Sequence, residues 1–160
     1  MEILLLSGAV VLTALVGVSW SRRQGAVRGP RAADGRVDWA SHGVDLGTRA
    51  TFVQFTTQVC AACRSTARVL GTQAGDGVVH HELDVEDHLA LTGRLAVLRT
   101  PTVLVLDRYG TEVARMSGGV SPAQAREALA RATSQDHAAP PEHGTTADAR
   151  AAVAAKGPER

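Results

Sequence analysis

Residues 51–64, TFVQFTTQVCAACR, determine the fold class of this chain, because they join a strand pattern directly to a helix pattern. Residues 51–56 alternate along an extended chain and are rich in Thr, Val and Phe, which predicts a buried strand. Residues 60–71 carry apolar side chains among polar ones and end at a glycine, which predicts a helix. Cys60 and Cys63 therefore lie where a strand gives way to a helix.

The rest of the central region continues this alternation. Three more strands are predicted, at residues 78–85, 102–106 and 112–116. Two more helices are predicted, at residues 86–97 and 121–133, the second with Ser121 as N-cap and Pro122 in its first turn. This order predicts an α/β domain over residues 36–133, with a central mixed sheet and helices on both faces.

The two cysteines lie where a thiol is reactive. A thiol at a helix N-terminus faces unsatisfied backbone N–H groups and the positive end of the helix dipole, which favour the thiolate. We expect Cys60 to be the exposed nucleophile. Cys63, one turn further and more buried, would attack the mixed disulfide that Cys60 forms. The pair is thus predicted to be a redox-active disulfide and the catalytic centre.

Three other interpretations of the cysteine pair remain. A structural zinc site needs four ligands, but the sequence has no second CxxC, and His80, His81 and His88 lack paired ligand spacing. A static disulfide across a two-residue gap closes a very small loop and constrains the chain little. The third interpretation is a pair of buried thiols without a chemical role. Of these interpretations we prefer the redox pair, and we expect no metal site.

Over about residues 50–133, the sequence resembles the thioredoxin superfamily. The resemblance rests on five stretches, TFVQFTTQVCAACR (51–64), LDV (83–85), LRTPTVLVL (98–106), YG (109–110) and SGG (117–119). A CxxC pair alone is a weak signal, whereas CxxC followed later by Thr-Pro directly before an apolar strand is specific. The resemblance implies a thioredoxin-like three-layer fold and thiol–disulfide oxidoreductase activity without a cofactor.

The resemblance also implies roles for three residues outside the CxxC pair. In that family the proline that matches Pro101 is cis, and its loop packs against the active-site disulfide. Thr100, beside it, would offer backbone groups to an extended substrate. Gly118 matches a glycine that leaves room for the partner near the disulfide. The implied substrate-binding set is therefore Thr100, Pro101 and Gly118.

Several positions depart from the family pattern. The family usually has Trp before the first cysteine and Gly-Pro between the two, where this chain has Val59 and Ala61-Ala62. The buried Asp that assists proton transfer at the second cysteine is replaced by Gln54, which cannot titrate. We expect Glu82, on the neighbouring strand, to be solvated rather than to approach the motif. These departures imply a narrower substrate range than that of a general disulfide reductase.

An uncharged apolar run from Ile3 to Val18 precedes the domain. Extended through Trp20 it covers about 18 residues, or about 27 Å of helix, close to the hydrocarbon thickness of a bilayer. A cleaved secretory signal is the alternative, but the run lacks its positive n-region and small-x-small cleavage site. We therefore expect residues 1–21 to be a single transmembrane anchor.

The charges that flank this run predict its orientation. Arginines follow the run, and no Lys or Arg precedes it; they are Arg22, Arg23, Arg28 and Arg31. Because basic flanks tend to remain cytoplasmic, we expect the domain on the cytoplasmic side, with the extracytoplasmic side as the alternative. Residues 22–35 are interpreted as a flexible basic linker, and residues 134–160, with Pro-Pro and scattered charge, as a disordered tail.

The composition of the chain argues against a nucleic-acid partner. The leading hypothesis is a redox enzyme tethered to a membrane. The chain of 160 residues carries 17 Lys+Arg against 16 Asp+Glu, without the basic excess of a nucleic-acid binder. The expected partners are protein disulfide substrates, an upstream electron donor or reductase, and the membrane, and the chain is expected to be a monomer. One alternative is an extracytoplasmic thioredoxin-like reductant that serves envelope disulfides or cytochrome maturation. The other is a non-catalytic thioredoxin-fold binding module at the membrane.

Overall fold

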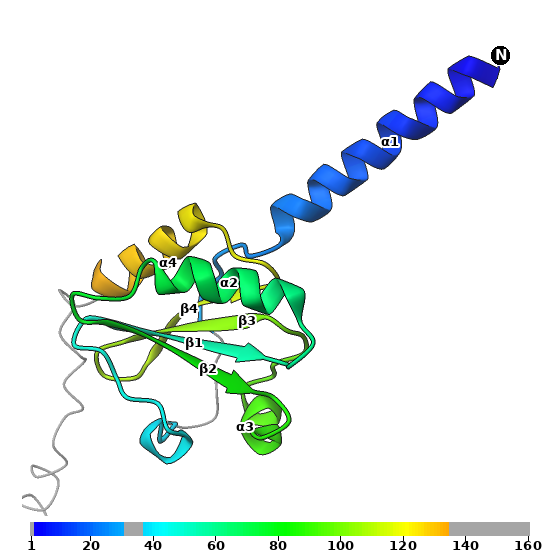
Figure 1. Cartoon of the computed structure of the whole chain (residues 1–160). Helices are drawn as coiled ribbons and strands as arrows, with labels where there is room; N and C mark the ends of the chain where they lie inside the picture. The colour runs from blue at the N-terminus through cyan, green and yellow to red at the C-terminus, as the bar shows by residue number, and fades with distance from the viewer. Residues whose placement is uncertain (1, 31–36, 135–160) are drawn as a thin grey trace, which may run out of the picture.

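The computed structural model describes residues 2–30 and 37–134, and Figure 1 shows how their elements are arranged. The helices in these ranges are α1 (Glu2–Arg23), α2 (Ala61–Gly71), α3 (Leu89–Arg94) and α4 (Pro122–Ser134), with a 3-10 turn η1 (Ala40–His42). The strands are β1 (Ala50–Thr56), β2 (Val78–Asp84), β3 (Thr102–Asp107) and β4 (Glu112–Ser117). From β1 onward, the order of elements is the one predicted from the sequence.

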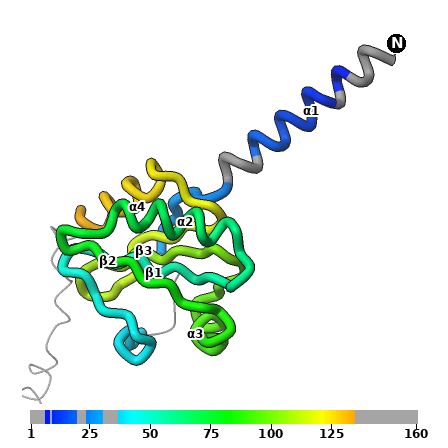
Figure 2. The backbone as a smooth tube through the Cα atoms, viewed as in Figure 1, coloured from blue at the N-terminus to red at the C-terminus, as the bar shows by residue number. Residues whose placement is uncertain are grey.

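The strands form one mixed sheet in the order β2–β1–β3–β4. Strand β1 pairs parallel to β2, with Gln54 opposite Glu82, whereas the pairs β1–β3 and β3–β4 are antiparallel. Helices α2 and α4 cover one face of the sheet, and α3 and η1 lie on the other (Figure 1, Figure 2). The predicted mixed sheet with helices on both faces is confirmed.

Alternation along β1 divides the core into two clusters. Phe52 belongs to the cluster that includes Leu70 of α2 and Ala128 of α4, and all three side chains are fully buried. Phe55 belongs to the cluster on the other face, with the buried Leu91 of α3. Because successive residues of a strand point to opposite faces, the single stretch that forms β1 supplies both layers of the core.

Helix α3 is shorter than the helix expected over residues 86–97. Its start is delayed because the Asp84 side chain accepts a hydrogen bond of 2.9 Å from the Glu86 N–H, which holds the chain after β2 in a turn. Its C-cap is Leu95, because Ala96 has a left-handed φ of 49° that no helix continues through.

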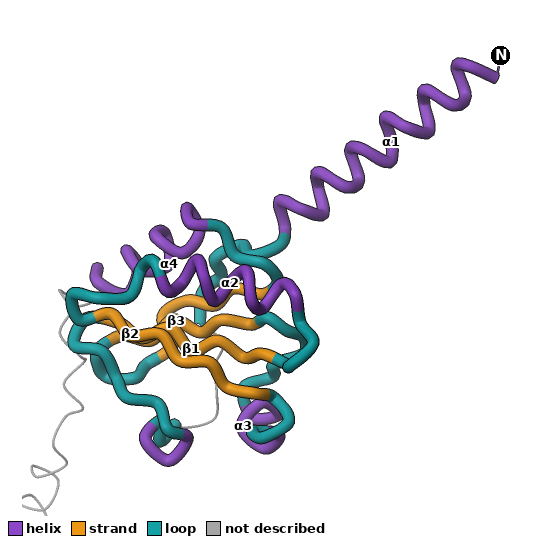
Figure 3. The backbone as a smooth tube through the Cα atoms, in the orientation of Figure 1, coloured by secondary structure: helices purple, strands orange, loops and turns teal. Residues whose placement is uncertain are grey.

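The segment after α1 is paired with the sheet, whereas we expected a flexible linker. Residues 24–28, named here the N-terminal strap, follow α1 as a non-helical stretch (Figure 3). The Gly25 N–H donates to the Ser117 carbonyl at 2.9 Å, and Arg28 and Arg115 exchange backbone hydrogen bonds of 2.8 and 2.9 Å. The open edge of β4 provides these partners, and Arg28 and Arg115 form an isolated antiparallel bridge there.

Helix α1 extends away from the rest of the chain (Figure 1). Large aliphatic side chains are exposed along it, namely Val10, Val11, Leu12, Leu15, Val16 and Val18. Within the ranges that the structure describes, no helix combines the length and the apolar character that crossing a bilayer requires. The end of the linker expected over residues 22–35 and nearly all of the tail expected over 134–160 lie outside the described residues.

His80 on β2 is expected to make the stability of the fold depend on pH. Burial, and then the neighbouring His81, lower the pKa of His80 from 6.5 to about 4. The unfolded chain therefore takes up the proton at a higher pH than the folded chain, so the free energy of unfolding should fall as the pH decreases from 6.5 to about 4. We expect His80→Gln to flatten this dependence in urea unfolding across that range. An unchanged slope in the variant would contradict the role of His80.

Candidate active site

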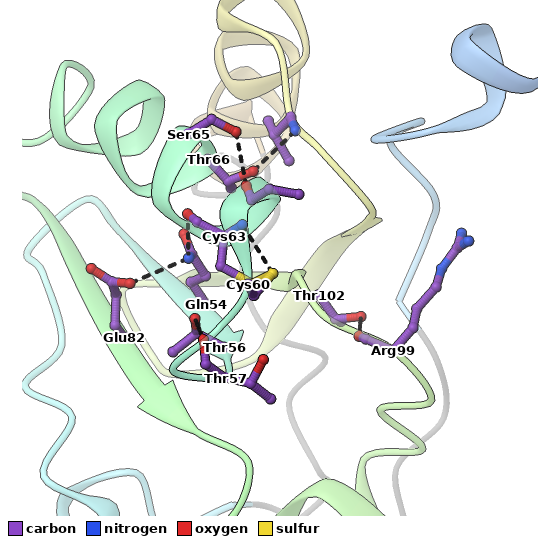
Figure 4. Close-up of a disulfide and its surroundings, with 12 residues drawn as sticks. Gln54, Thr56, Thr57, Cys60, Cys63, Ser65, Thr66, Glu82, Arg99 and Thr102 are labelled. Carbon is purple, nitrogen blue, oxygen red and sulfur yellow. Dashed lines mark hydrogen bonds between the residues drawn. A yellow bond between two sulfur atoms is a disulfide. The ribbon is translucent and has the colours of Figure 1, made fainter.

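The two cysteines form a disulfide at the start of α2 (Figure 4). The Cα atoms of Cys60 and Cys63 are 5.2 Å apart, and Cys60 is the N-cap residue of the helix. The Cys63 N–H donates to the Cys60 sulfur at 3.1 Å, so this sulfur takes the place of a capping oxygen. The same N–H group would stabilise a thiolate at Cys60. Among the described residues, no three side chains of His, Cys, Asp or Glu are grouped so that they could hold a metal ion.

The two cysteines differ in their access to solvent. Cys63 is 1% exposed, whereas Cys60 is partly exposed and follows Val59, which is 91% exposed. The prediction of an accessible Cys60 and a buried Cys63 is confirmed. Because a substrate disulfide reaches only a sulfur at the surface, this arrangement suits attack by Cys60 and resolution by Cys63, which remain predicted roles.

The Thr100–Pro101 peptide bond is cis, as the resemblance implied. Pro101 is buried, Thr100 is partly buried, and the Pro101 carbonyl accepts a hydrogen bond of 2.7 Å from the Gly118 N–H. Arg99 and Thr102, on either side of this bond, belong to the surroundings of the disulfide drawn in Figure 4. The packing of the loop against the disulfide stays a prediction. Substrate binding by Thr100, Pro101 and Gly118 stays a prediction.

Gly118 lies against the N-terminal strap. Its φ is +90°, and a Cβ added at this position would lie 3.4 Å from the Gln24 side chain. The Gln24 carbonyl in turn accepts a hydrogen bond of 2.9 Å from the Gln124 side chain of α4. The space beside Gly118, which the resemblance reserves for a partner, is therefore bordered by a residue of the chain itself.

Gln54 links β1 to the cysteine motif. Its side chain is fully buried, and its Nε2 donates to the Cys63 carbonyl at 3.0 Å and to a Glu82 carboxylate oxygen at 3.3 Å. Its Oε1 has no hydrogen-bond partner among the residues that the structure describes. Glu82 is exposed, as expected of a solvated strand residue, and one of its carboxylate oxygens also accepts the hydrogen bond from Gln54. The parallel register that places Gln54 opposite Glu82 is the cause.

Thr66 is a positioning residue that the sequence analysis missed. It is fully buried, and its hydroxyl accepts a hydrogen bond of 3.2 Å from the Val120 N–H. This bond ties the segment after Gly118 to α2, three residues after Cys63. A polar residue on the same helix face as a buried cysteine was the signal available in the sequence.

No protein-family model and no curated protein matches the sequence. Among solved structures, a mutant thioredoxin from Halobacterium salinarum NRC-1 matches with a TM-score of 0.52 and 19% identity, over 66% of this chain and 91% of that chain. A thioredoxin of Malassezia sympodialis matches with a TM-score of 0.49 and 19% identity, over 66% of this chain and 93% of that one. A thioredoxin of Fasciola hepatica matches with a TM-score of 0.47 and 28% identity, over 53% of this chain and 82% of that chain. The halobacterial match, taken with the sheet order and the disulfide, shows that this chain has the thioredoxin fold with a CxxC pair, Cys60 and Cys63, at the start of α2.

Proposed function

We propose that the chain is a thiol–disulfide oxidoreductase that exchanges disulfides with protein substrates through Cys60 and Cys63. The observation that carries the proposal is the geometry of the pair in a thioredoxin fold, an N-cap Cys60 at the surface bonded to a Cys63 that is 1% exposed. Val59 and Leu98, which precede the cysteine motif and the Pro101 loop, are 91% and 85% exposed. Both side chains are therefore accessible to a protein that approaches these two motifs.

The proposed reaction moves two electrons from the cysteine pair to the substrate. The Cys60 thiolate attacks one sulfur of the substrate disulfide, which forms a mixed disulfide and expels the other substrate sulfur as a thiolate. The Cys63 thiolate then attacks the Cys60 sulfur, which closes the Cys60–Cys63 disulfide and expels the second substrate thiolate. The protons that the two cysteines lose end on the substrate thiols. A dithiol reductant returns the pair to its reduced form.

A binding module with an inactive cysteine pair is the second candidate. Gln54 favours it, because an amide neither takes up nor releases a proton near neutral pH. Val59, in place of an aromatic residue before the first cysteine, favours it as well. The partly exposed Cys60 at the N-terminus of a helix supports the enzyme instead, together with a narrow substrate range.

Reduction of insulin by dithiothreitol distinguishes the enzyme from the binding module. We expect the full chain to accelerate precipitation of the insulin B chain over dithiothreitol alone, because Cys60 is accessible to a protein disulfide. Alkylating the reduced pair beforehand should remove the acceleration. A rate equal to that of dithiothreitol alone would favour the binding module.

We further propose that α1 tethers the domain to a membrane, with the domain on the cytoplasmic side. The support is the uncharged run from Ile3 to Val18, the exposed aliphatic side chains of α1 and the arginines that follow. In the cytoplasm the thiol pool would keep the pair reduced, so the protein would act as a reductant. An extracytoplasmic reductant is the alternative. Protease access to the domain in intact cells, compared with inverted vesicles, distinguishes the two sides.

Deleting residues 1–21 should release the domain from the membrane without unfolding it. The hydrogen bonds of the strap begin at Gln24 and Gly25, so this deletion leaves the strap in place. We expect the truncated chain in the supernatant after ultracentrifugation, with insulin reduction retained, and the full chain in the membrane pellet. Aggregation or loss of redox activity in the truncated chain would mean that α1 belongs to the core of the domain.

A further inference from the structure

A pocket of about 330 Å³ lies between the N-terminal strap and the loop before Pro101. Arg28 borders it from the strap, Leu98 and Arg99 border it from the loop, and Thr102 and Ser117 border it from the sheet. The pocket exists in this form because the strap is paired with the edge of β4.

The pocket carries an excess of positive charge. Arg115 also lines it, but its guanidinium donates to both carboxylate oxygens of Glu112, at 2.9 and 2.7 Å, so this charge is neutralised. Arg28 and Arg99 are exposed, and within residues 2–30 and 37–134 neither guanidinium has a hydrogen-bond or ion-pair partner. Two unpaired guanidinium groups that line one pocket favour the binding of an anion there.

The register of the sheet places this pocket beside the redox loop. Thr102 follows Pro101 directly and lies opposite Ser117 in β4, and both Thr102 and Ser117 line the pocket. In Figure 4 the Arg99 side chain extends away from the disulfide, on the side of the N-terminal segment drawn in blue. An extended peptide bound at the Pro101 loop would therefore continue into the pocket.

We infer that this pocket binds a carboxylate side chain of the protein substrate, so that the domain selects disulfides flanked by acidic residues. The inference rests on the proposed thiol–disulfide exchange. Arginine suits a carboxylate because its guanidinium presents two parallel N–H donors to the two oxygens. A peptide is favoured over a free anion because Thr102, which lines the pocket, directly follows the Thr100–Pro101 loop expected to hold the substrate.

Two synthetic peptide disulfides test this preference with the full chain. Each peptide has one central cysteine and blocked termini, and the residues on both sides of the cysteine are Glu in one peptide and Gln in the other. Each reduction rate is divided by the rate with dithiothreitol alone, which removes the intrinsic effect of the charges. We expect the normalised rate to be about tenfold higher for the Glu peptide, the effect of one additional charge-assisted contact.

A pair of double variants tests whether the two arginines cause the preference. Arg28→Gln with Arg99→Gln should reduce the preference to near unity, because the rate on the Glu peptide falls toward the rate on the Gln peptide. Arg68→Gln with Arg126→Gln removes the same charge from exposed positions on α2 and α4, and it should keep the preference. A preference that survives the first pair, or is lost in the second, would overturn the inference.

Gly25→Ala tests the strap while both arginines keep their charge. Gly25 has a φ of +66°, and a Cβ there would lie 2.5 Å from the Gly119 carbonyl oxygen, so alanine should displace the strap and carry Arg28 away from the pocket. We expect Gly25→Ala to lose the preference for the Glu peptide. If the preference survives, the pocket does not cause it. Equal normalised rates for the two peptides with the unmodified chain would contradict carboxylate binding by the pocket and leave the proposed function standing. No reduction of either would overturn the proposed function.

Discussion

Cys60→Ser should lower insulin reduction to the rate of dithiothreitol alone. The chain has two cysteines, and the remaining one, Cys63, is 1% exposed and out of reach of a protein disulfide. Cys63→Ser should behave differently, because Cys60 keeps its place at the helix N-terminus and still attacks, but nothing resolves the mixed disulfide. We expect stable adducts of Cys63→Ser with substrate proteins on non-reducing gels, which disappear when reductant is added.

The matched control for trapping is Cys60→Ser, which should form no adducts. Alkylation of the reduced protein checks the same roles without a substrate. We expect iodoacetamide at neutral pH to modify Cys60 well before Cys63, as followed by peptide mass spectrometry. Equal or faster labelling of Cys63 would contradict the assigned roles. An absence of trapped partners would favour the binding module.

Arg115→Leu should destabilise the fold by about 3–5 kcal/mol, the cost of breaking a buried ion pair by removing one of its members. The side chains of Arg115 and Glu112 are 5% and 10% exposed and lie 2.7 Å apart. Arg115 also donates to the Leu95 carbonyl at 2.7 Å, which ties β4 to the end of α3. The variant therefore removes one guanidinium from both the Glu112 carboxylate and the Leu95 carbonyl. Urea unfolding followed by circular dichroism measures the loss.

The chain offers a matched control in Arg131→Leu. Arg131 and Glu127 form an ion pair of 2.8 Å on α4, but their side chains are 41% and 56% exposed. Water already solvates both charges, so the loss should stay below about 1 kcal/mol. Similar losses in the two variants would show that the burial of the Arg115–Glu112 pair has no energetic consequence.

The junction of β1 and α2 was predictable because its information is local. The alternation of residues 51–56, the CxxC pair and a helix that ends at a glycine all lie within one short window. The burial of Cys63 follows from its place one turn into a helix that packs on the sheet. The cis bond before Pro101 came from the family resemblance alone, because a Thr-Pro pair does not reveal its isomer.

The contact of Gln54 with Glu82 and the pairing of the strap were not predictable, because both depend on partners far away along the chain. Gln54 and Glu82 meet only because β1 and β2 are parallel in one particular register. The composition of the strap is typical of a flexible segment. Its backbone groups nevertheless bond to the open edge of β4, an interaction that hardly depends on side-chain identity.

The strap also limits how far the redox site travels from α1. The ends of a flexible chain as long as the expected linker would lie about 20 Å apart on average. The domain could then take any position within about that distance of the end of α1. Here α1 ends at Arg23, and the first backbone bond of the strap is at Gly25, which leaves a joint of a single residue. If Cys60 exchanges disulfides as proposed, it would have a high effective concentration toward a disulfide held close to the end of α1. A disulfide held beyond the reach of this joint would not meet Cys60, however reactive the thiolate is.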